Sequence, residues 1–335
     1  MPDATHADSS SATGLPDGYL PRPYGIDFSL AVAPGGYLWW YVDAISDDGE
    51  QAMTLIVFVG SVFSPYYAAA RRRGDAPAEN HCAFNAILYG PGRRKRWSMT
   101  ERSSRRLQRS ERALQIGPSA LHWDGEQLVA EIDERCTPWP AALRGRISVQ
   151  PAPLSTHSLQ LDAAGRHRWH PLAPIARVRI AMREPQVHWE GAGYLDSNAG
   201  DEPLEQGFRD WDWSRAALPG GDCAVLYHTR DRAGSDRRLA MRFDAAGTLR
   251  CSEPPPLQPL PATPLWRIPR STLAAADSAA QVLRTLEDTP FYARSLLRTA
   301  CDGEALTAVH ESLSLSRFER RWVQTLLPFR MPRWG

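Results

Sequence analysis

Two short patterns in the sequence combine residue types that could carry acid–base chemistry. They are Tyr194-x-Asp196 and His167-x-Trp169. In each pattern one residue separates the two, so in a β-strand both side chains point to the same face. If the strand of Asp196 lines an apolar interior, desolvation disfavours the charged carboxylate and raises its pKa. A carboxyl group that keeps its proton at neutral pH can act as a general acid.

Simpler interpretations of both patterns stay open at this point. Asp196 is followed by Ser197-Asn198, so its carboxylate could merely cap a turn. His167 could be a surface histidine that happens to lie beside a tryptophan. The residues themselves do not choose between these interpretations and an acid site.

A neighbouring segment, His188-Trp189-Glu190, competes as a source of the catalytic group. It lies just upstream of Tyr194 and could supply an imidazole or a carboxylate instead. Glu190 and Asp196 are six residues apart, a spacing that puts both on one face of a strand. A glycosidase that uses this pair of carboxylates is therefore a further alternative.

The elements that must position these residues are mainly strands. Residues 36–44 and 52–62 flank the turn signal Asp47-Asp48-Gly49, which predicts a strand, a turn and a strand. Many short segments of the same kind follow, separated by Asp, Gly and Pro, and the 28 prolines disfavour long helices. This pattern is typical of an all-β sandwich or barrel. The further predicted strands are residues 82–89, 97–101, 113–116, 120–123, 128–134, 144–150, 173–182, 187–195, 223–229, 238–244 and 265–268.

The last part of the chain has a different pattern. Apolar residues recur at spacings of three and four within 273–286, 292–299 and 306–327, which predicts a helical C-terminal segment. Phe318, Trp322 and Leu326 are expected to form the inward stripe of its last helix. A length of 335 residues suggests two core-forming domains. The expected division is a disordered tail over 1–17, two β-domains over 18–165 and 166–270, and the helical segment over 271–335.

Composition and motifs exclude several classes of protein. A formal net charge of +1 argues against binding of nucleic acid through a strongly basic surface. The five cysteines are scattered without a C-x-x-C pair, which predicts free thiols and no zinc or other metal site. No G-x-G-x-x-G, P-loop, G-x-S-x-G or H-E-x-x-H motif occurs, so we expect no conventional cofactor.

Membrane contact and location are predicted only in outline. The N-terminal residues do not form a secretory signal, and no apolar run is long enough to span a bilayer, so we expect a cytoplasmic protein. The basic runs 71–73 and 93–96 are expected in loops. They are either solvated turns or contacts to anionic lipid headgroups.

Several long segments of the sequence resemble the carotenoid 1,2-hydratases of photosynthetic bacteria. The resemblance covers roughly residues 18–329. It implies two consecutive lipocalin-like β-barrel domains and cofactor-free addition of water to the terminal C1=C2 bond of acyclic carotenoids such as neurosporene and lycopene. The basic runs and the first dozen residues have no counterpart in the resemblance, which leaves membrane contact open. The segments that carry it are residues 36–44, 58–67, 80–85, 188–198 and 285–292.

The resemblance also implies which residues form the site. A His-x-Trp pair and a Tyr-x-Asp pair are taken as essential in this family, with the aspartate as proton donor. These correspond to His167, Trp169, Tyr194 and Asp196. We expect Tyr194 to orient Asp196, Trp169 to face the cation formed at C1, and His167 to position the water.

A carotenoid substrate requires apolar walls, and the chain is rich in aromatic residues, with 12 Trp. Affinity should come from buried apolar area, at about 25 cal/mol per Å². Because such a substrate resides in the bilayer, we expect the protein at the cytoplasmic surface of the photosynthetic membrane. The expected wall residues are Trp39, Trp40, Tyr41, Trp189, Trp211 and Trp213, the last two being alternatively a surface lid.

Two functions from other classes remain as alternatives. A non-catalytic carotenoid or lipid carrier needs the same cavity but no proton donor. A cofactor-free cyclase or isomerase could use one buried acid to form a cation that is not captured by water.

Overall fold

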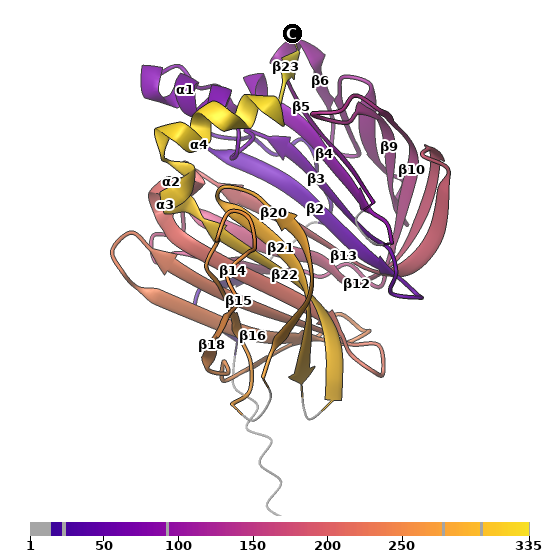
Figure 1. The fold of residues 1–335 in the computed structure, drawn as a ribbon, viewed down its shortest axis with the longest axis vertical. Helices are drawn as coiled ribbons and strands as arrows, with labels where there is room; N and C mark the ends of the chain where they lie inside the picture. Colours follow the sequence, from indigo (N-terminus) through magenta and orange to yellow (C-terminus); the bar gives the residue numbers. More distant parts are fainter. Residues whose placement is uncertain (1–14, 22–24, 92–93, 277–278, 302–303, 335) are drawn as a thin grey trace, which may run out of the picture.

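The computed structural model describes residues 15–21, 25–91, 94–276, 279–301 and 304–334. Most of the predicted tail over 1–17 lies outside the described residues. Strands dominate the described part of the chain, which confirms the all-β prediction. They form two large curled sheets that lie against each other, the first mostly indigo to pink and the second orange to yellow in Figure 1.

The first sheet has 14 strands and holds most residues from Tyr19 to Gly200. All of its pairings are antiparallel except that of β23 with β5. The spatial order is β23-β5-β4-β3-β2-β13-β12-β10-β9-β8-β7-β6, with β11 beside β12 and β1 beside β11. Its strands are β1 (Tyr19–Pro21), β2 (Tyr37–Ser46), β3 (Ala52–Val59), β4 (Cys82–Tyr89), β5 (Lys95–Arg102), β6 (Leu107–Arg109), β7 (Ala113–Ile116), β8 (Ser119–Trp123), β9 (Leu128–Arg135), β10 (Ala142–Pro151), β11 (His157–Gln160), β12 (His167–Glu184), β13 (Val187–Gly200) and β23 (Arg333–Trp334).

The second sheet has seven strands in the order β17-β16-β15-β14-β22-β21-β20. A separate two-stranded sheet, β18 with β19, accompanies it. The strands are β14 (Phe208–Ala217), β15 (Cys223–Asp231), β16 (Asp236–Phe243), β17 (Leu249–Ser252), β18 (Leu257–Leu260), β19 (Arg270–Leu273), β20 (Gln281–Asp288), β21 (Tyr292–Cys301) and β22 (Glu304–Ser314).

The helices are short, and in the described residues none is long and apolar enough to cross a bilayer. Figure 1 shows α1 and α4 at one end of the two sheets. The helical elements are α1 (Pro65–Arg73), α2 (Leu204–Gly207), α3 (Leu315–Phe318), α4 (Arg321–Leu326) and the 3₁₀ turns η1 (Ala78–Asn80), η2 (Ser104–Arg106) and η3 (Leu327–Phe329).

Two apolar clusters result from the alternation of side chains along the strands. One fills the interior of the curled first sheet and includes Trp40 and Val42. The other lies between the two sheets and includes Trp39 and Tyr41 from the same strand, β2. Odd-numbered and even-numbered residues of β2 therefore face different interiors, and only one of them contains the candidate site.

The prediction of a helical segment from residue 271 is wrong over most of its length. Residues 281–288, 292–301 and 304–314 form β20, β21 and β22. On β22, Val309 and Leu313 join the cluster between the sheets, while Leu306 and Ala308 join a third cluster on the opposite face. Because both faces are buried, apolar residues lose the period of two and imitate a helical spacing.

The predicted inward stripe of the last helix is also corrected. Phe318 is buried, as expected, but Trp322 and Leu326 are 43% and 38% exposed. Phe318 belongs to a separate short helix, α3, and α4 is only six residues long with Val323 as its buried residue, so the three residues do not form one stripe.

The chain passes from the first sheet to the second after Gly200, whereas the expected domain boundary lay after Gly165. The strands β12 and β13 belong to the first sheet because β13 pairs along its length with β2, from Gly191 opposite Ser46 to Gly200 opposite Tyr37. This long-range pairing has no signal in the local sequence.

The basic runs also differ from the expectation of loops. Arg71–Arg73 form the last turn of α1, where cations interact favourably with the helix dipole. Lys95 and Arg96 begin β5, and Arg93 lies outside the described residues.

Candidate active site

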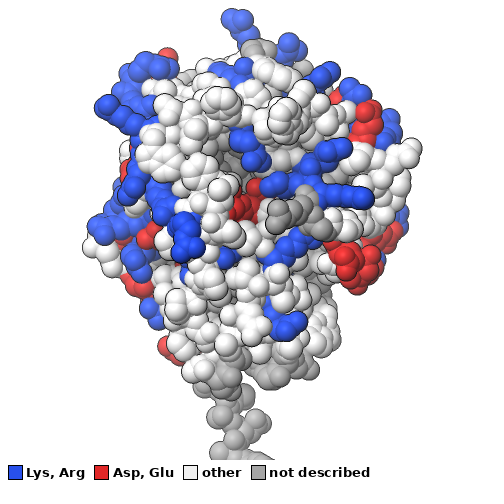
Figure 2. Space-filling model, viewed as in Figure 1, with Lys and Arg blue, Asp and Glu red and all other residues white. Residues whose placement is uncertain are grey.

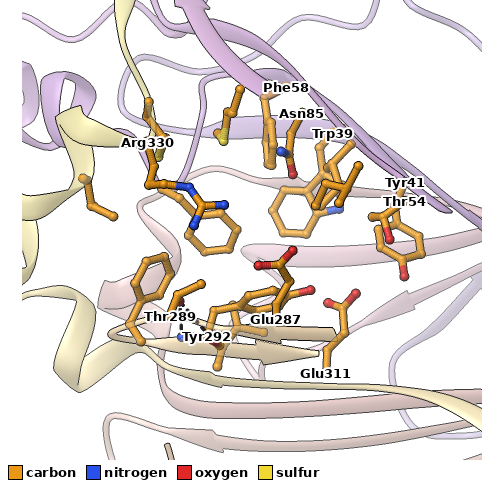
Figure 3. Close-up of a pocket in the computed structure, with 18 of the residues that line it drawn as sticks. Trp39, Tyr41, Thr54, Phe58, Asn85, Glu287, Thr289, Tyr292, Glu311 and Arg330 are labelled. Atoms are coloured by element: carbon orange, nitrogen blue, oxygen red, sulfur yellow. Dashed lines mark hydrogen bonds between the residues drawn. The ribbon is translucent and has the colours of Figure 1, made fainter. Parts of the chain in front are cut away.

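A cavity of about 350 Å³ lies between the two sheets. In Figure 3, Trp39 and Tyr41 of the first sheet face Glu287, Tyr292 and Glu311 of the second. Its walls are mostly apolar, so a polar group in the cavity is poorly hydrated. The aromatic lining residues are Trp39, Tyr41, Phe58, Phe63, Trp97, Trp211, Trp213, Tyr227, Trp266, Phe291, Tyr292 and Phe329.

Asp196 lines this cavity from β13 and is only 3% exposed. Its Oδ2 accepts two hydrogen bonds, from Trp169 Nε1 and from the Tyr194 hydroxyl, each 2.8 Å long. Its Oδ1 has no hydrogen-bond partner among the described residues. No basic side chain bonds to this carboxyl group in the described structure, so nothing in its immediate contacts compensates a negative charge.

Burial raises the pKa of Asp196 to about 8. The two hydrogen-bond donors oppose this rise, and the negative charges of Glu311 and Asp43 add to it. At neutral pH the group is therefore mainly a neutral acid. Because Oδ2 already accepts two hydrogen bonds, the proton belongs on Oδ1, the atom with no other partner.

Trp169 and Tyr194 are held firmly around the acid. Both side chains are fully buried, and the ring of Trp169 packs on Tyr227 with centroids 4.9 Å apart. Burial raises the pKa of Tyr194 well above its ordinary value, so its hydroxyl remains a donor. The structure thus brings together three of the four residues predicted from the two sequence patterns.

The fourth predicted residue, His167, lies elsewhere. Its Nδ1 is 2.8 Å from the Tyr37 hydroxyl, its Nε2 is 3.2 Å from Glu202, and its ring packs on Phe208. It neither lines the cavity nor bonds to Asp196. His167 is the first residue of β12, two residues before Trp169. At this end of the strand its ring contacts Phe208, the first residue of β14 in the second sheet. The expected role of His167 in positioning the water is therefore corrected, because its imidazole does not face the cavity.

The expected role of Trp169 toward a cation also needs correction. Trp169 is not a lining residue of the cavity, because its indole lies behind Asp196 and donates to it. Trp213 and Tyr227 are among the rings of the facing sheet that do line the cavity.

Four of the six predicted wall residues line the cavity, namely Trp39, Tyr41, Trp211 and Trp213. Trp40 does not, because it points to the opposite face of β2 and packs on Phe28 at 4.9 Å. Trp189 does not either, since it packs against the cluster inside the first sheet. Strand alternation separates both from the site.

The competing carboxylate, Glu190, lies away from the cavity. Its side chain is exposed and forms ion pairs with Arg179 and Arg177. These arginines hold the pKa of Glu190 below its ordinary value. Glu190 and Asp196 therefore do not assemble the carboxylate pair that a glycosidase would need.

A second Tyr-x-Asp pattern, Tyr41-x-Asp43, lies directly beside the first and was missed from the sequence. In the antiparallel pairing of β2 with β13, Tyr41 is opposite Asp196 and Tyr194 is opposite Asp43. The Tyr41 hydroxyl donates to Asp43 at 2.8 Å. Arg215 of β14 also binds Asp43, with Nε 2.8 Å from Oδ1.

A buried ion pair beside the cavity was also missed: Glu311 lines the cavity and pairs with Arg294, which is not a lining residue. Arg294 donates in addition to the hydroxyl groups of Tyr41, at 2.7 Å, and Tyr292, at 2.9 Å. Burial raises the pKa of Glu311, and the Arg294 guanidinium opposes that rise. Because the region was expected to be helical, no local signal could place these residues opposite Asp196.

In the described ranges, no group of three or more His, Cys, Asp or Glu side chains is arranged to hold a metal ion. The polar groups at the acid itself are a carboxyl, a phenol and an indole. Such a set can donate a proton and then stabilise the carboxylate that remains.

Known proteins resemble this chain in sequence and in fold. The family model described as carotenoid hydratase CrtC matches residues 55–335. The acyclic carotenoid 1,2-hydratase of Thiocapsa roseopersicina is 50% identical over 333 residues, covering 98% of this chain and 82% of that protein. The protein of the same name from Rubrivivax gelatinosus is 51% identical over 308 residues, covering 91% of this chain and 75% of that protein.

Two solved structures share the fold at low sequence identity. A putative AttH from Nitrosomonas europaea has a TM-score of 0.57 and 14% identity, covering 83% of this chain and 91% of that one. Kievitone hydratase from Nectria haematococca has a TM-score of 0.51 and 10% identity, covering 90% of this chain and 98% of that one. These likenesses show the fold, an all-β arrangement of lipocalin-like sheets. With the family match over most of its length, the chain belongs to the carotenoid hydratase family.

Proposed function

We propose that this protein is a hydro-lyase that adds water across the terminal C1=C2 bond of acyclic carotenoids by acid catalysis. The observation that carries the proposal is the buried, neutral Asp196, whose unpartnered Oδ1 lies in an aromatic cavity. Its relatives at about half identity bear the name acyclic carotenoid 1,2-hydratase, which supplies the substrate class.

The first step transfers the proton of Asp196 Oδ1 to C2 of the alkene. The two electrons of the C1=C2 bond form the new C2–H bond, and positive charge remains on the tertiary carbon C1. Trp169 and Tyr194 already donate to Oδ2, so they stabilise the carboxylate as it forms. Water then bonds to C1 through its oxygen and loses one proton, which leaves a tertiary alcohol.

The cation at C1 is stabilised by the walls of the cavity. Trp213 and Tyr227 line it from the facing sheet, and an aromatic face toward a desolvated cation is worth about 2 kcal/mol. That corresponds to about thirtyfold in rate.

Incubation with lycopene in ¹⁸O-water tests the reaction. A hydratase places the label in a tertiary alcohol, whereas a cyclase or isomerase forms an unlabelled product. A carrier forms no product and binds carotenoid equally well with Asp196→Asn. Label in the alcohol that disappears with Asp196→Asn supports the proposal, and any other combination contradicts it.

We further propose that the protein works at the cytoplasmic surface of the photosynthetic membrane. One end of the cavity is lined by Trp266, Leu326 and Phe329, and Phe329 is 74% exposed. Trp322 lies beside them, stacked on Trp266, and is also exposed. An apolar rim at the cavity entrance would let a substrate pass from the bilayer without crossing water.

Exposed basic residues lie near this apolar rim. Arg320 and Arg321 are exposed at α4. The exposed Arg72 of α1 lines one pocket with Phe318 and Gln324, where Glu205 and Glu319 are also present. Figure 2 shows Lys and Arg side chains spread over much of the face viewed there. Such a surface favours anionic headgroups, at about 1 kcal/mol for each cation near the surface.

Flotation with lipid vesicles tests the membrane proposal. We expect wild-type protein to float with phosphatidylglycerol vesicles more than with phosphatidylcholine vesicles, and the double variant Leu326→Ser/Phe329→Ser to float less. Leu20→Ser, at another exposed apolar residue that lies on β1 outside the cavity lining, is the matched control. Equal flotation of both variants and the wild type would refute this surface.

A further inference from the structure

A second polar side chain faces the same cavity with an unused atom. Asn198 lies two residues after Asp196 on β13, so both side chains share one face. It lines the cavity and is 3% exposed. Its side chain hydrogen-bonds to the Tyr227 hydroxyl, yet its Oδ1 has no partner among the described residues.

The facing sheet offers a complementary donor. The indole nitrogen of Trp213, Nε1, is buried and has no hydrogen-bond partner in the described structure. Its ring lies 5.2 Å from the ring of Tyr194, so it is next to the acid. Buried polar atoms nearly always have partners, and ordered water supplies them where protein does not.

The register of the strands places these atoms around the acid. In the pairing of β12 with β13, Asn198 lies directly opposite Trp169, the residue that donates to Asp196. Asp196 Oδ1, Asn198 Oδ1 and Trp213 Nε1 are thus three buried polar atoms without a partner among the described residues, on side chains that line the same cavity.

Building on the proposed function, we propose that Asn198 and Trp213 hold the water that captures the carbocation. Asn198 Oδ1 accepts one hydrogen of this water, and Trp213 Nε1 donates to its oxygen. The remaining lone pair of the oxygen forms the bond to C1. The second hydrogen passes as a proton to Oδ1 of the Asp196 carboxylate, which restores the acid with no net change in the protein.

Substrate turnover in D₂O separates capture of the cation from its formation. A cation that is not captured returns to alkene by losing one of the two hydrogens on C2. When rotation about the C2–C3 bond presents the original hydrogen to the carboxylate, its loss leaves deuterium in the recovered substrate. We expect Asn198→Ala to slow hydration about tenfold, the effect of one hydrogen bond. Deuterium exchange should continue, so the ratio of exchange to hydration should rise by a similar factor. Equal loss of both reactions in Asn198→Ala would overturn the proposal.

Trp213→Phe is an independent variant, because it keeps the ring and removes only the Nε1–H donor. We expect the same ratio to rise, by a smaller factor. If Asn198→Ala does not fold by circular dichroism, Trp213→Phe decides the matter, and an unchanged ratio there overturns the proposal.

Asn85→Ala is the matched control. Asn85 is another buried asparagine of the cavity, but its Nδ2 already donates to the Ser98 carbonyl at 2.9 Å. Whatever its effect on KM, it should leave the ratio of exchange to hydration as in the wild type. A ratio that rises in Asn85→Ala as much as in Asn198→Ala would overturn the assignment to Asn198. Asp196→Asn should lose both reactions, and if it retains them the acid itself, not the water site, is misassigned.

Discussion

Two Tyr-x-Asp segments lie side by side in this protein, and they differ in the group that meets the carboxyl. Tyr41-x-Asp43 and Tyr194-x-Asp196 are paired across antiparallel strands, and each tyrosine donates to its own aspartate at 2.8 Å. Asp43 also binds the guanidinium of Arg215, whereas Asp196 binds the neutral indole of Trp169. Both aspartates are buried.

The comparison shows how one motif serves two purposes. A buried carboxylate beside a guanidinium forms an ion pair, and losing either partner leaves an uncompensated charge. A buried carboxyl beside an indole has hydrogen bonds but no compensating charge, so its protonated form is favoured. Asp43 thus fastens the first sheet to the second through Arg215, while Asp196 is available as an acid.

The largest expected effect separates the two aspartates by activity. Asp196→Asn should lower the rate of hydration about 10²–10⁴-fold, the usual contribution of a general acid. Asp43→Asn should retain most of the rate per folded molecule. Product formation from lycopene, normalised to the folded fraction, measures both. Similar losses in the two variants would remove the distinction between them.

The next largest effect is a difference in stability between the variants at Asp43 and Asp196. Asp43→Asn leaves Arg215 buried without its counter-ion, which should cost about 3–5 kcal/mol of unfolding free energy. Asp196→Asn replaces a neutral acid by a neutral amide and should cost much less. Urea unfolding at pH 7 compares the variants, and the opposite order of stabilities would contradict the ion-pair interpretation.

The two tyrosines sharpen the comparison further. Tyr194→Phe removes a donor that stabilises the Asp196 carboxylate, so hydration should slow about tenfold. Tyr41→Phe removes a donor from Asp43, which keeps Arg215, so a smaller effect on the rate of hydration is expected. The rate constant of a single turnover reports this difference. A slower reaction in Tyr41→Phe than in Tyr194→Phe would reverse the assignment.

The dependence on pH gives a smaller, graded effect. With a pKa of about 8, Asp196 is protonated below that pH, so kcat/KM should be level there and fall up to tenfold per unit above it. Glu311→Gln removes a negative charge that raises this pKa, so the fall should begin at lower pH. A wild-type profile that is flat to pH 10 would refute the acid.

The same group should affect stability with a defined sign. Folded protein keeps the proton of Asp196 up to about pH 8, while an unfolded aspartate loses it near pH 4. The folded state therefore binds more protons in this window, and the free energy of unfolding falls as pH rises, by at most about 1.4 kcal/mol per unit. Asp196→Asn should remove the contribution of this group, so its slope should be smaller than that of the wild type, which urea unfolding at pH 5 and pH 7 measures.

The fold was predictable where turn residues separate short, strand-like apolar runs. These signals located most strands of the first sheet, including β2, β3 and β4, although both faces of these strands are buried. The prediction failed at β20–β22, because apolar residues from the two opposite faces of β22 recur at spacings of three and four, as in a helix. It also failed to place β12 and β13 in the first sheet, because their pairing with β2 joins residues far apart in sequence.

The candidate site was predictable in part, because side chains alternate between the two faces of a strand. A spacing of two residues placed Tyr194 and Asp196 on one face, and Trp39 and Tyr41 on another shared face. It could not show that His167 lies away from the cavity, since that position depends on contacts with Glu202 and Phe208. The ion pair of Arg294 with Glu311 lies on the second sheet and becomes part of the site only when the sheets pack.

By itself the sequence determined that two tyrosine–aspartate pairs exist and that each pair shares a strand face, because the alternation of a strand is a local property. It did not determine that Asp196 keeps its proton, or that Asp43 meets a guanidinium. That was decided by the tertiary structure, which brings Arg215 of β14 to Asp43 and the indole of Trp169 to Asp196. Charge compensation and desolvation depend on neighbours from distant strands, and no spacing within one strand encodes them.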